Sequence, residues 1–271
     1  MPVCRVKLTP GGIDGRMGRQ GMIFYFTATG NSKFIAEKIS AETGDQLKNI
    51  AECIQADSFS FDLAGGESVG IVSPVYFRGV PMIVAEFVQK LSISGKPGAY
   101  SYVVLNCGGT AGKAEKFIPP AFRPDAVFDV ATVSNYVPMY HMDGEEDIER
   151  RLDGAEREID EIVQHIKGGD RGVFARCRGR FPGLVSSLSY PIYRHGRKTG
   201  KFTVNGNCTG CGICESVCPR QVIRLENGRP VWTLPRCEIC LGCLHRCPSS
   251  AINYGKKSAE NGRYLNPRVS L

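Results

Sequence analysis

Two runs of cysteine contain the side chains with the clearest chemistry in this sequence of 271 residues. Both runs have the spacing C-x2-C-x2-C-x3-C-P, and an apolar pair follows each proline at the same distance. A repeat with constant ligand spacing indicates a duplicated structural unit. The first run is Cys208, Cys211, Cys214 and Cys218 before Pro219, and the second is Cys237, Cys240, Cys243 and Cys247 before Pro248.

Soft thiolate ligands of this kind bind iron–sulfur clusters, zinc or copper. In this spacing three thiolates of a run surround one [4Fe–4S] cube, and the fourth, next to proline, reaches the other cube. Two structural zinc sites are the alternative, but zinc sites usually use separated C-x2-C pairs. The spacing therefore predicts one cluster on Cys208, Cys211, Cys214 and Cys247, and another on Cys237, Cys240, Cys243 and Cys218.

The rest of the sequence must supply the elements that position these groups. From residue 22 onward, short apolar runs alternate with amphipathic stretches, which is typical of βα units and a parallel sheet. We expect strands at 22–26, 46–50, 68–74, 102–106 and 126–133, and helices at 32–43, 81–91, 110–122 and 145–166. The pattern predicts an α/β fold, a flavodoxin-like doubly wound parallel sheet of five strands in the order 2-1-3-4-5. A small α+β ferredoxin-like domain with the two clusters follows it.

The length allows one ordinary domain and one small one. The first 21 residues lack the apolar core of a signal peptide, and no apolar run approaches the roughly 20 residues that span a bilayer. We expect a cytoplasmic protein, because most of its twelve cysteines fit cluster ligation rather than disulfides. The expected segments are an N-terminal tail (1–21), a flavodoxin-like domain (22–168), a basic linker (169–201), a ferredoxin domain (202–256) and a C-terminal tail (257–271).

Three segments that follow predicted strands lie on the sheet edge where doubly wound folds bind ligands. The loop from Thr27 to Ser32 places hydroxyls, an amide and a glycine at the start of a helix, an arrangement that binds anions. It has no lysine and no G-x-G-x-x-G pattern, so it is neither a triphosphate loop nor a dinucleotide loop. The candidate ligand-binding residues are Thr27, Thr29, Gly30, Asn31, Ser32, Ser73, Pro74, Val75, Tyr76, Asn106, Gly108 and Gly109.

With both halves considered, the chain resembles flavodoxin–ferredoxin fusions, a family of mostly uncharacterised electron carriers. The resemblance covers about residues 22–268 and rests on the T-x-T-G-N-S loop in 26–32, on 73–76 and on the two cysteine runs. It also includes 230–232 and 262–264. The resemblance implies FMN as a cofactor, with its phosphate in the loop and its ring near 73–79 and 106–110. It implies no substrate.

The net charge of +7 counts the cysteines as neutral. Each oxidised cube with four thiolates carries about −2, and a flavin phosphate adds about −1.5 to −2. The loaded protein is then close to neutral, which argues against nucleic acid as a partner. The basic residues of 169–201 either form a solvated connection beside the acidic clusters or a docking surface for an acidic redox partner protein.

The sequence contains no Ser/His/Asp set, no H-E-x-x-H motif and no clear acid–base pair, so the catalytic residues are unknown. We expect an electron-transfer protein that relays electrons between two [4Fe–4S] clusters and FMN. The alternative is a flavin-dependent oxidoreductase that reduces a small acceptor such as a quinone or nitro compound. A third possibility is a flavodoxin half that has lost FMN and only docks a partner. His245, between two cluster ligands, is expected to face solvent.

Overall fold

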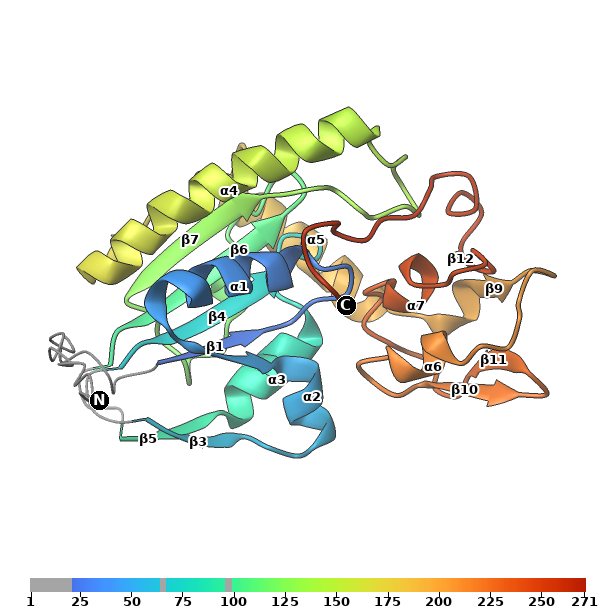
Figure 1. Ribbon diagram of the computed structural model, residues 1–271, viewed down its shortest axis with the longest axis horizontal. Coiled ribbons are helices and arrows are strands. Elements are labelled where there is room, and N and C mark those ends of the chain that lie inside the picture. Colours follow the sequence, from blue (N-terminus) through green and yellow to red (C-terminus); the bar gives the residue numbers. More distant parts are fainter. Residues whose placement is uncertain (1–20, 64–66, 96–98) are drawn as a thin grey trace, which may run out of the picture.

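The computed structural model describes residues 21–63, 67–95 and 99–271. All but the last residue of the predicted N-terminal tail therefore lies outside the described residues. An α/β domain forms one side of the molecule, and the smaller cysteine-rich part lies beside it, to the right in Figure 1. Among the described residues no helix is both long and apolar enough to cross a membrane.

The core of the α/β domain is a parallel sheet in the order β2-β1-β4-β6-β7-β8. The predicted doubly wound parallel sheet is confirmed, and its first five strands follow the predicted order. The prediction of five strands was one too few, because the two residues of β8 pair with the start of β7. So short a pair has no sequence pattern of its own. The strands are β1 (Met22–Tyr25), β2 (Gln46–Asn49), β4 (Val69–Pro74), β6 (Ser101–Cys107), β7 (Ala126–Ala131) and β8 (Gly172–Val173).

Helices cover both faces of this sheet because successive residues of a strand point to opposite sides. Ile23 and Tyr25 of β1 pack with α1 (Asn31–Thr43) and α4 (Glu145–Gly168), whereas Phe24 packs with α2 (Ile50–Gln55) and α3 (Met82–Lys90). Figure 1 shows α4 above the sheet and α2 and α3 below it. Two short strands, β3 (Ser60–Asp62) and β5 (Ser92–Ser94), pair separately at the lower edge.

The helix predicted at 110–122 is reduced to the single 3₁₀ turn η1 (Ala114–Phe117). Gly112 precedes it with a φ of +65°, a left-handed conformation that no helix contains. Pro119 and Pro120 follow it, and proline cannot continue a helix. The glycine and the two prolines therefore limit the helix to one turn, although the apolar pattern of this segment predicts a longer one.

The predicted linker contains regular structure. Helix α5 (Pro182–Gly196) buries Ser186, Tyr190 and Tyr193 against the α/β domain, and the 3₁₀ turn η2 (Thr199–Lys201) follows. The Tyr190 ring lies 4.0 Å from that of Phe117 in η1, and its hydroxyl donates to the Val80 carbonyl at 2.7 Å. The segment is thus packed onto the sheet domain beside the ligand-binding edge.

The cysteine-rich part is a small α+β unit with an internal pseudo-repeat. A short helix carries the third cysteine of each run, and the helix is followed by the C-P step. The small unit and the α/β domain share the C-terminal segment, which returns to the α/β domain after β12, as Figure 1 shows in red. The elements are β9 (Phe202–Val204) paired with β12 (Ile252–Tyr254), β10 (Ile223–Glu226) paired with β11 (Arg229–Trp232), α6 (Ile213–Ser216) and α7 (Gly242–His245).

Candidate functional site

The fold brings the fourth cysteine of each run to the triplet of the other run. Burial raises the pKa of the Cys237 thiol to about 11, and the neighbouring Cys218 adds to this effect. Burial also raises the pKa of Cys243, again with Cys218 among the charges that add to it. For Cys214 burial raises the pKa, and Cys211 and Cys247 contribute. This crossed arrangement is the one that the ligand assignment requires.

Backbone amides point at the sulfurs in a repeated way. The Val222 amide donates to Cys218 Sγ at 3.4 Å, and the Ala251 amide donates to Cys247 Sγ at 3.3 Å. The two amides occupy equivalent places in the repeat. N–H···S bonds of this kind set the potential of a cluster and offset the charge on its thiolates.

The cysteines of the two runs offer the thiolate donors that [4Fe–4S] cubes require. Among the described residues no three His, Cys, Asp or Glu side chains converge closely enough to hold one metal ion. Zinc needs its sulfurs about 2.3 Å from one centre, whereas each thiolate of a cube binds a different iron. The first triplet reaches the surface at Cys211, which is exposed, while Cys243 of the second triplet is buried. Cys208 lies in the loop before α6, with its Sγ 4.0 Å from the Gly228 carbonyl oxygen.

A cavity of about 840 Å³ opens at the carboxyl ends of the sheet strands. Ten of the twelve candidate ligand-binding residues line it, from the loop after β1 and from the ends of β4 and β6. The other two lie behind its wall. Ser73 is fully buried with its hydroxyl turned to the Pro74 carbonyl oxygen, and Gly30 faces the C-terminal segment. The volume is in the range of cofactor sites.

Gly30 takes a φ of +104° before the first turn of α1. A Cβ atom at this position would lie 2.8 Å from Cβ of Asn266 and 2.9 Å from a methyl group of Val269. Both the conformation and the close approach of the C-terminal segment therefore require glycine.

The loop between β1 and α1 offers donors to an anion. Helix α1 begins without a side-chain cap, so its first amides are available at the positive end of a 13-residue helix. The hydroxyl oxygen of Thr27 accepts from the Gly30 amide at 3.0 Å, and the hydroxyl oxygen of Thr29 accepts from Asn135 Nδ2 at 2.6 Å. Both hydroxyl groups keep their own hydrogens for a ligand, since each acts as acceptor in these bonds.

Asn31 is held by the C-terminal segment. Its Oδ1 accepts from Tyr264 Oη at 2.6 Å and from Asn266 Nδ2 at 3.0 Å, and its Nδ2 donates to the Val133 carbonyl at 3.2 Å. These contacts satisfy the side-chain amide inside the protein. Asn31 therefore fixes the shape of the loop, and the loop amides and hydroxyls are the groups best placed for a phosphate.

Aromatic rings form another wall of the cavity. The Tyr193 ring of α5 lies 6.1 Å from Phe77 in a stacked arrangement and 5.7 Å from Tyr76 edge to face. Burial raises the pKa of the Tyr76 phenol, and Cys240 adds to this rise. Tyr193 and Asn135 were not predicted as site residues, because nothing in the local sequence marks residues that reach the cavity from α5 and from the loop after β7.

The cysteine-rich unit and the cavity meet at the segment Ile239–Leu241, which lines the cavity. Cys240, a candidate ligand of the second cluster, belongs to this segment. Arg246 after α7 donates from Nε to the Ala28 carbonyl at 2.9 Å, which ties the same region to the loop after β1.

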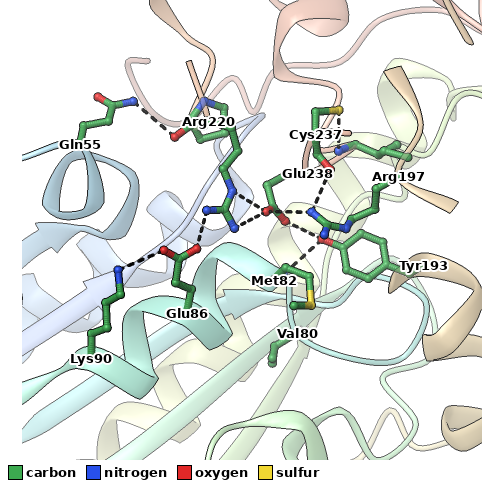
Figure 2. A network of polar contacts seen from close by, with 12 residues as sticks. Gln55, Val80, Met82, Glu86, Lys90, Tyr193, Arg197, Arg220, Cys237 and Glu238 are labelled. Carbon is green, nitrogen blue, oxygen red and sulfur yellow. Dashed lines mark hydrogen bonds and ion pairs between the residues drawn. The ribbon is translucent and has the colours of Figure 1, made fainter. Parts of the chain in front are cut away.

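A buried carboxylate holds this segment in place (Figure 2). The Glu238 side chain is 0% exposed and accepts from Tyr193 Oη at 2.6 Å and from Arg220 Nε at 2.7 Å. Arg197 lies 3.4 Å away, and Arg220 also pairs with Glu86 of α3 at 2.6 Å. Burial works to lower the pKa of Arg220, but Glu238 and Glu86 raise it above its ordinary value. The network joins α3, α5 and the cysteine-rich unit at one point.

The prediction that His245 faces solvent was wrong. The side chain is buried, and its Nε2–H donates to the Asn135 carbonyl at 3.0 Å while Nδ1 accepts from the Tyr264 amide at 3.2 Å. These partners fix a neutral tautomer. Burial lowers the pKa of His245 to about 4. The histidine joins α7, the loop after β7 and the C-terminal segment, a contact that local sequence cannot show.

Comparisons with known proteins agree with this division of the chain. A family model described as flavodoxin domain matches residues 22–131, and one described as 4Fe-4S dicluster domain matches residues 207–252. The hydrogenase-2 operon protein HybA of Escherichia coli O157:H7 is 28% identical, over 28% of this chain and 27% of that protein. The HybA of Shigella flexneri matches with the same values. The chain thus spans about a quarter of the length of these relatives.

A solved structure, the rubredoxin oxygen:oxidoreductase of Desulfovibrio gigas, is 15% identical with a TM-score of 0.29. It covers 55% of this chain and 36% of its own, a likeness too weak to bear on fold or function. The two domain matches support a role in electron transfer with iron–sulfur and flavin groups. The chain has an N-terminal flavodoxin domain and a C-terminal 4Fe-4S dicluster domain, which is the domain arrangement of a flavodoxin–ferredoxin fusion.

Proposed function

We propose that this chain relays electrons between two [4Fe–4S] clusters and an FMN. The observation that carries the proposal is the shared wall between the two sites. Cys240, assigned to the second cluster, lines the same cavity as Thr29 of the anion loop and Tyr76 of the aromatic wall. A flavin in this cavity would therefore adjoin the second cluster, with the first cluster reached through the crossed cysteines.

Each cluster supplies one-electron transfer and the flavin accepts one or two electrons, so together they can gather single electrons into a pair. The hydroxyl groups of Thr27, Thr29 and Ser32 and the first amides of α1 would bind the phosphate. Ser32 is fixed for this role, since its Oγ accepts from Asn106 Nδ2 at 3.2 Å. The segments 74–76 and 106–109 would enclose the ring.

The surrounding residues hold the proposed cluster site and the proposed flavin site in fixed positions relative to each other. Glu238 anchors the backbone beside Cys237 and Cys240, and Arg197 Nη1 donates to the Cys237 carbonyl at 3.1 Å. The hydroxyl oxygen of Tyr193 accepts a hydrogen bond from the Met82 amide at 3.2 Å, and the Tyr193 side chain lines the cavity from α5. Fixed packing of this kind limits reorganisation and keeps water from the region between the sites.

We also propose that the protein works in a reducing cytoplasm and that a redox partner protein docks on the basic linker. Four of the eight basic residues of this segment are already paired within the chain, as Arg178 is with Glu115 at 2.9 Å. The other four are exposed and would attract an acidic partner. They are Arg180, Arg194, Lys198 and Lys201.

The test is the rate at which the flavin is reduced in protein purified without oxygen. A low-potential donor is mixed with the parent chain and with Cys240→Ser, and the flavin and cluster absorbances are followed separately. The relay predicts fast flavin reduction in the parent chain and a loss of the fast phase in Cys240→Ser, at equal FMN content. The control is Ser216→Ala in α6, because the half-buried Cys177 interacts with Cys107 and is not suitable.

Equal rates in the parent chain and in Cys240→Ser would refute the relay. Turnover of a quinone or nitro compound in the absence of a second protein would instead identify the chain as an oxidoreductase. A parent chain that purifies folded and with its iron but without FMN would leave only a docking role for the flavodoxin domain. Replacing Thr29 by Val should weaken FMN binding by about tenfold, because one hydrogen bond to a charged group contributes about 1.5 kcal/mol.

A further inference from the structure

Helix α5 has an unusual outer face. Its inner face buries Ser186, Tyr190 and Tyr193, as described above. On the opposite face stand four large apolar side chains, at the three- and four-residue spacing of one helix stripe. They are Phe181 at the helix start, 69% exposed, and Leu184, Leu188 and Ile192, which are 62%, 65% and 62% exposed.

The stripe also lacks groups that need directional partners. The Ser187 hydroxyl donates to the Gly183 carbonyl at 2.9 Å, and the Ser189 hydroxyl has the Val185 carbonyl at 2.7 Å and the Phe77 carbonyl at 2.9 Å as acceptors. The serines beside the stripe are thus satisfied within the chain. A specific protein interface of this size would carry several hydrogen-bonding groups. A contiguous apolar face of this kind marks a binding surface, and one without directional groups is best matched by hydrocarbon.

Positive charge surrounds the stripe. Arg180 precedes it, with its guanidinium 5.7 Å from the Phe181 ring, and the exposed Arg194 and Lys198 lie at its far end. Lys113 of the neighbouring segment approaches Gly183 within α5. The acid next to this segment, Glu115, is paired with Arg178. Two copies of the chain packed through this face would bring like charges together, so the charge pattern argues against self-association.

We propose that the outer face of α5 binds the surface of an anionic lipid bilayer, with the stripe Phe181, Leu184, Leu188 and Ile192 entering the boundary between headgroups and acyl chains. The cations at both ends of the stripe include Arg180, Arg194 and Lys198 of the surface proposed above for a redox partner, and on the membrane they would contact lipid phosphates in place of that partner. The inner face of the same helix contributes Tyr193 to the cavity. The membrane surface would therefore lie one helix away from the proposed flavin site. The inference concerns binding alone and does not depend on the electron relay.

The test is cosedimentation of the full chain, purified without oxygen, with vesicles at about 0.1 M salt. One set of vesicles contains equal parts of phosphatidylcholine and phosphatidylglycerol, and the other contains phosphatidylcholine alone. We expect binding to the anionic vesicles. The triple variant Leu184→Gln/Leu188→Gln/Ile192→Gln should bind at least about tenfold more weakly than the parent chain, because it removes the inserted apolar area.

Val173→Gln is the matched control, since Val173 is also apolar and 58% exposed but lies on β8. This variant should bind as the parent chain does. Iron content and melting temperature show whether the triple variant has folded, and its three sites are exposed enough that both should stay unchanged. Arg180→Glu/Arg194→Glu should also weaken binding, and salt should weaken the parent chain's binding only in part.

Several results would overturn the proposal. One is an absence of binding to the anionic vesicles, and another is equal binding by the parent chain and the folded triple variant. A parent chain that sediments as a dimer, with a monomeric triple variant, would assign the face to a second copy. Loss of electron exchange with an acidic redox protein in the triple variant, without vesicle binding by the parent chain, would assign it to a protein partner.

Discussion

Replacing Glu238 by Ala should weaken the contact between the two halves of the molecule and lower the stability of the protein. The carboxylate is fully buried and accepts hydrogen bonds from Tyr193 and Arg220, with Arg197 near it. Removing one partner of a buried ion pair leaves the other charges unpaired and costs about 3–5 kcal/mol. Arg220 keeps its contact with Glu86, so we expect the lower end, about 3 kcal/mol.

In a protein of this size a loss of 1 kcal/mol lowers the melting temperature by about 2–4 °C. Glu238→Ala should therefore melt about 6–12 °C below the parent chain. The assay is calorimetry of the cluster-loaded protein under anaerobic conditions, read as the apparent midpoint of the cooperative transition. Two-state analysis does not apply to a chain with two domains and bound clusters.

The matched control is Glu226→Ala, which removes an exposed glutamate from β10 of the same unit. It should change stability by no more than about 0.5 kcal/mol. The double variant Glu238→Ala/Arg220→Ala should be less unstable than the sum of its parts, since the two residues share one contact. A melting temperature of Glu238→Ala within about 1 °C of the parent chain would refute the role given to this network.

Three further substitutions test the loop, the sheet and the C-terminal segment. Gly30→Ala places a Cβ atom 2.8 Å from Asn266 at a φ of +104°, so it should cost about 1–3 kcal/mol and lower the FMN content on purification; unchanged values would contradict the close packing. Burial raises the pKa of Glu158, so the folded state binds more protons than the unfolded state and loses stability as the pH rises. Glu158→Gln should therefore melt higher than the parent chain at neutral pH and show no advantage below about pH 4, and the opposite order at neutral pH would be inconsistent with this reasoning. Tyr264→Phe removes the hydrogen bond to Asn31 and should cost about 1 kcal/mol at an unchanged iron content, whereas loss of iron would place the bond in the cluster site.

The sequence predicted the parts of this molecule that local pattern controls. Strands such as β1 and β6 are continuous apolar runs, because both faces of a parallel sheet are covered, and the cysteine spacing is set by the geometry of a cube. The candidate anion loop between β1 and α1 could be placed in the fold because it must follow a strand and begin a helix. These features depend on residues that are close together in the chain.

Residues that are distant in sequence account for most of what was missed. Glu238 lies between two candidate cluster ligands, and its sequence position gives no sign that it contacts Tyr193 of α5 or, through Arg220, meets α3. Tyr193 was assigned to a linker, yet it forms a wall of the cavity. His245 was expected at the surface, but the C-terminal segment covers it. Such contacts form only when separate elements pack together, and they leave no periodicity to detect.

The iron, sulfide, zinc and FMN content of the protein purified without oxygen shows whether the chain holds two clusters and a flavin. We expect about eight irons, about eight sulfides and one FMN per chain, as two cubes and one flavin require. Zinc in place of iron, or eight irons without any flavin, would contradict this expectation.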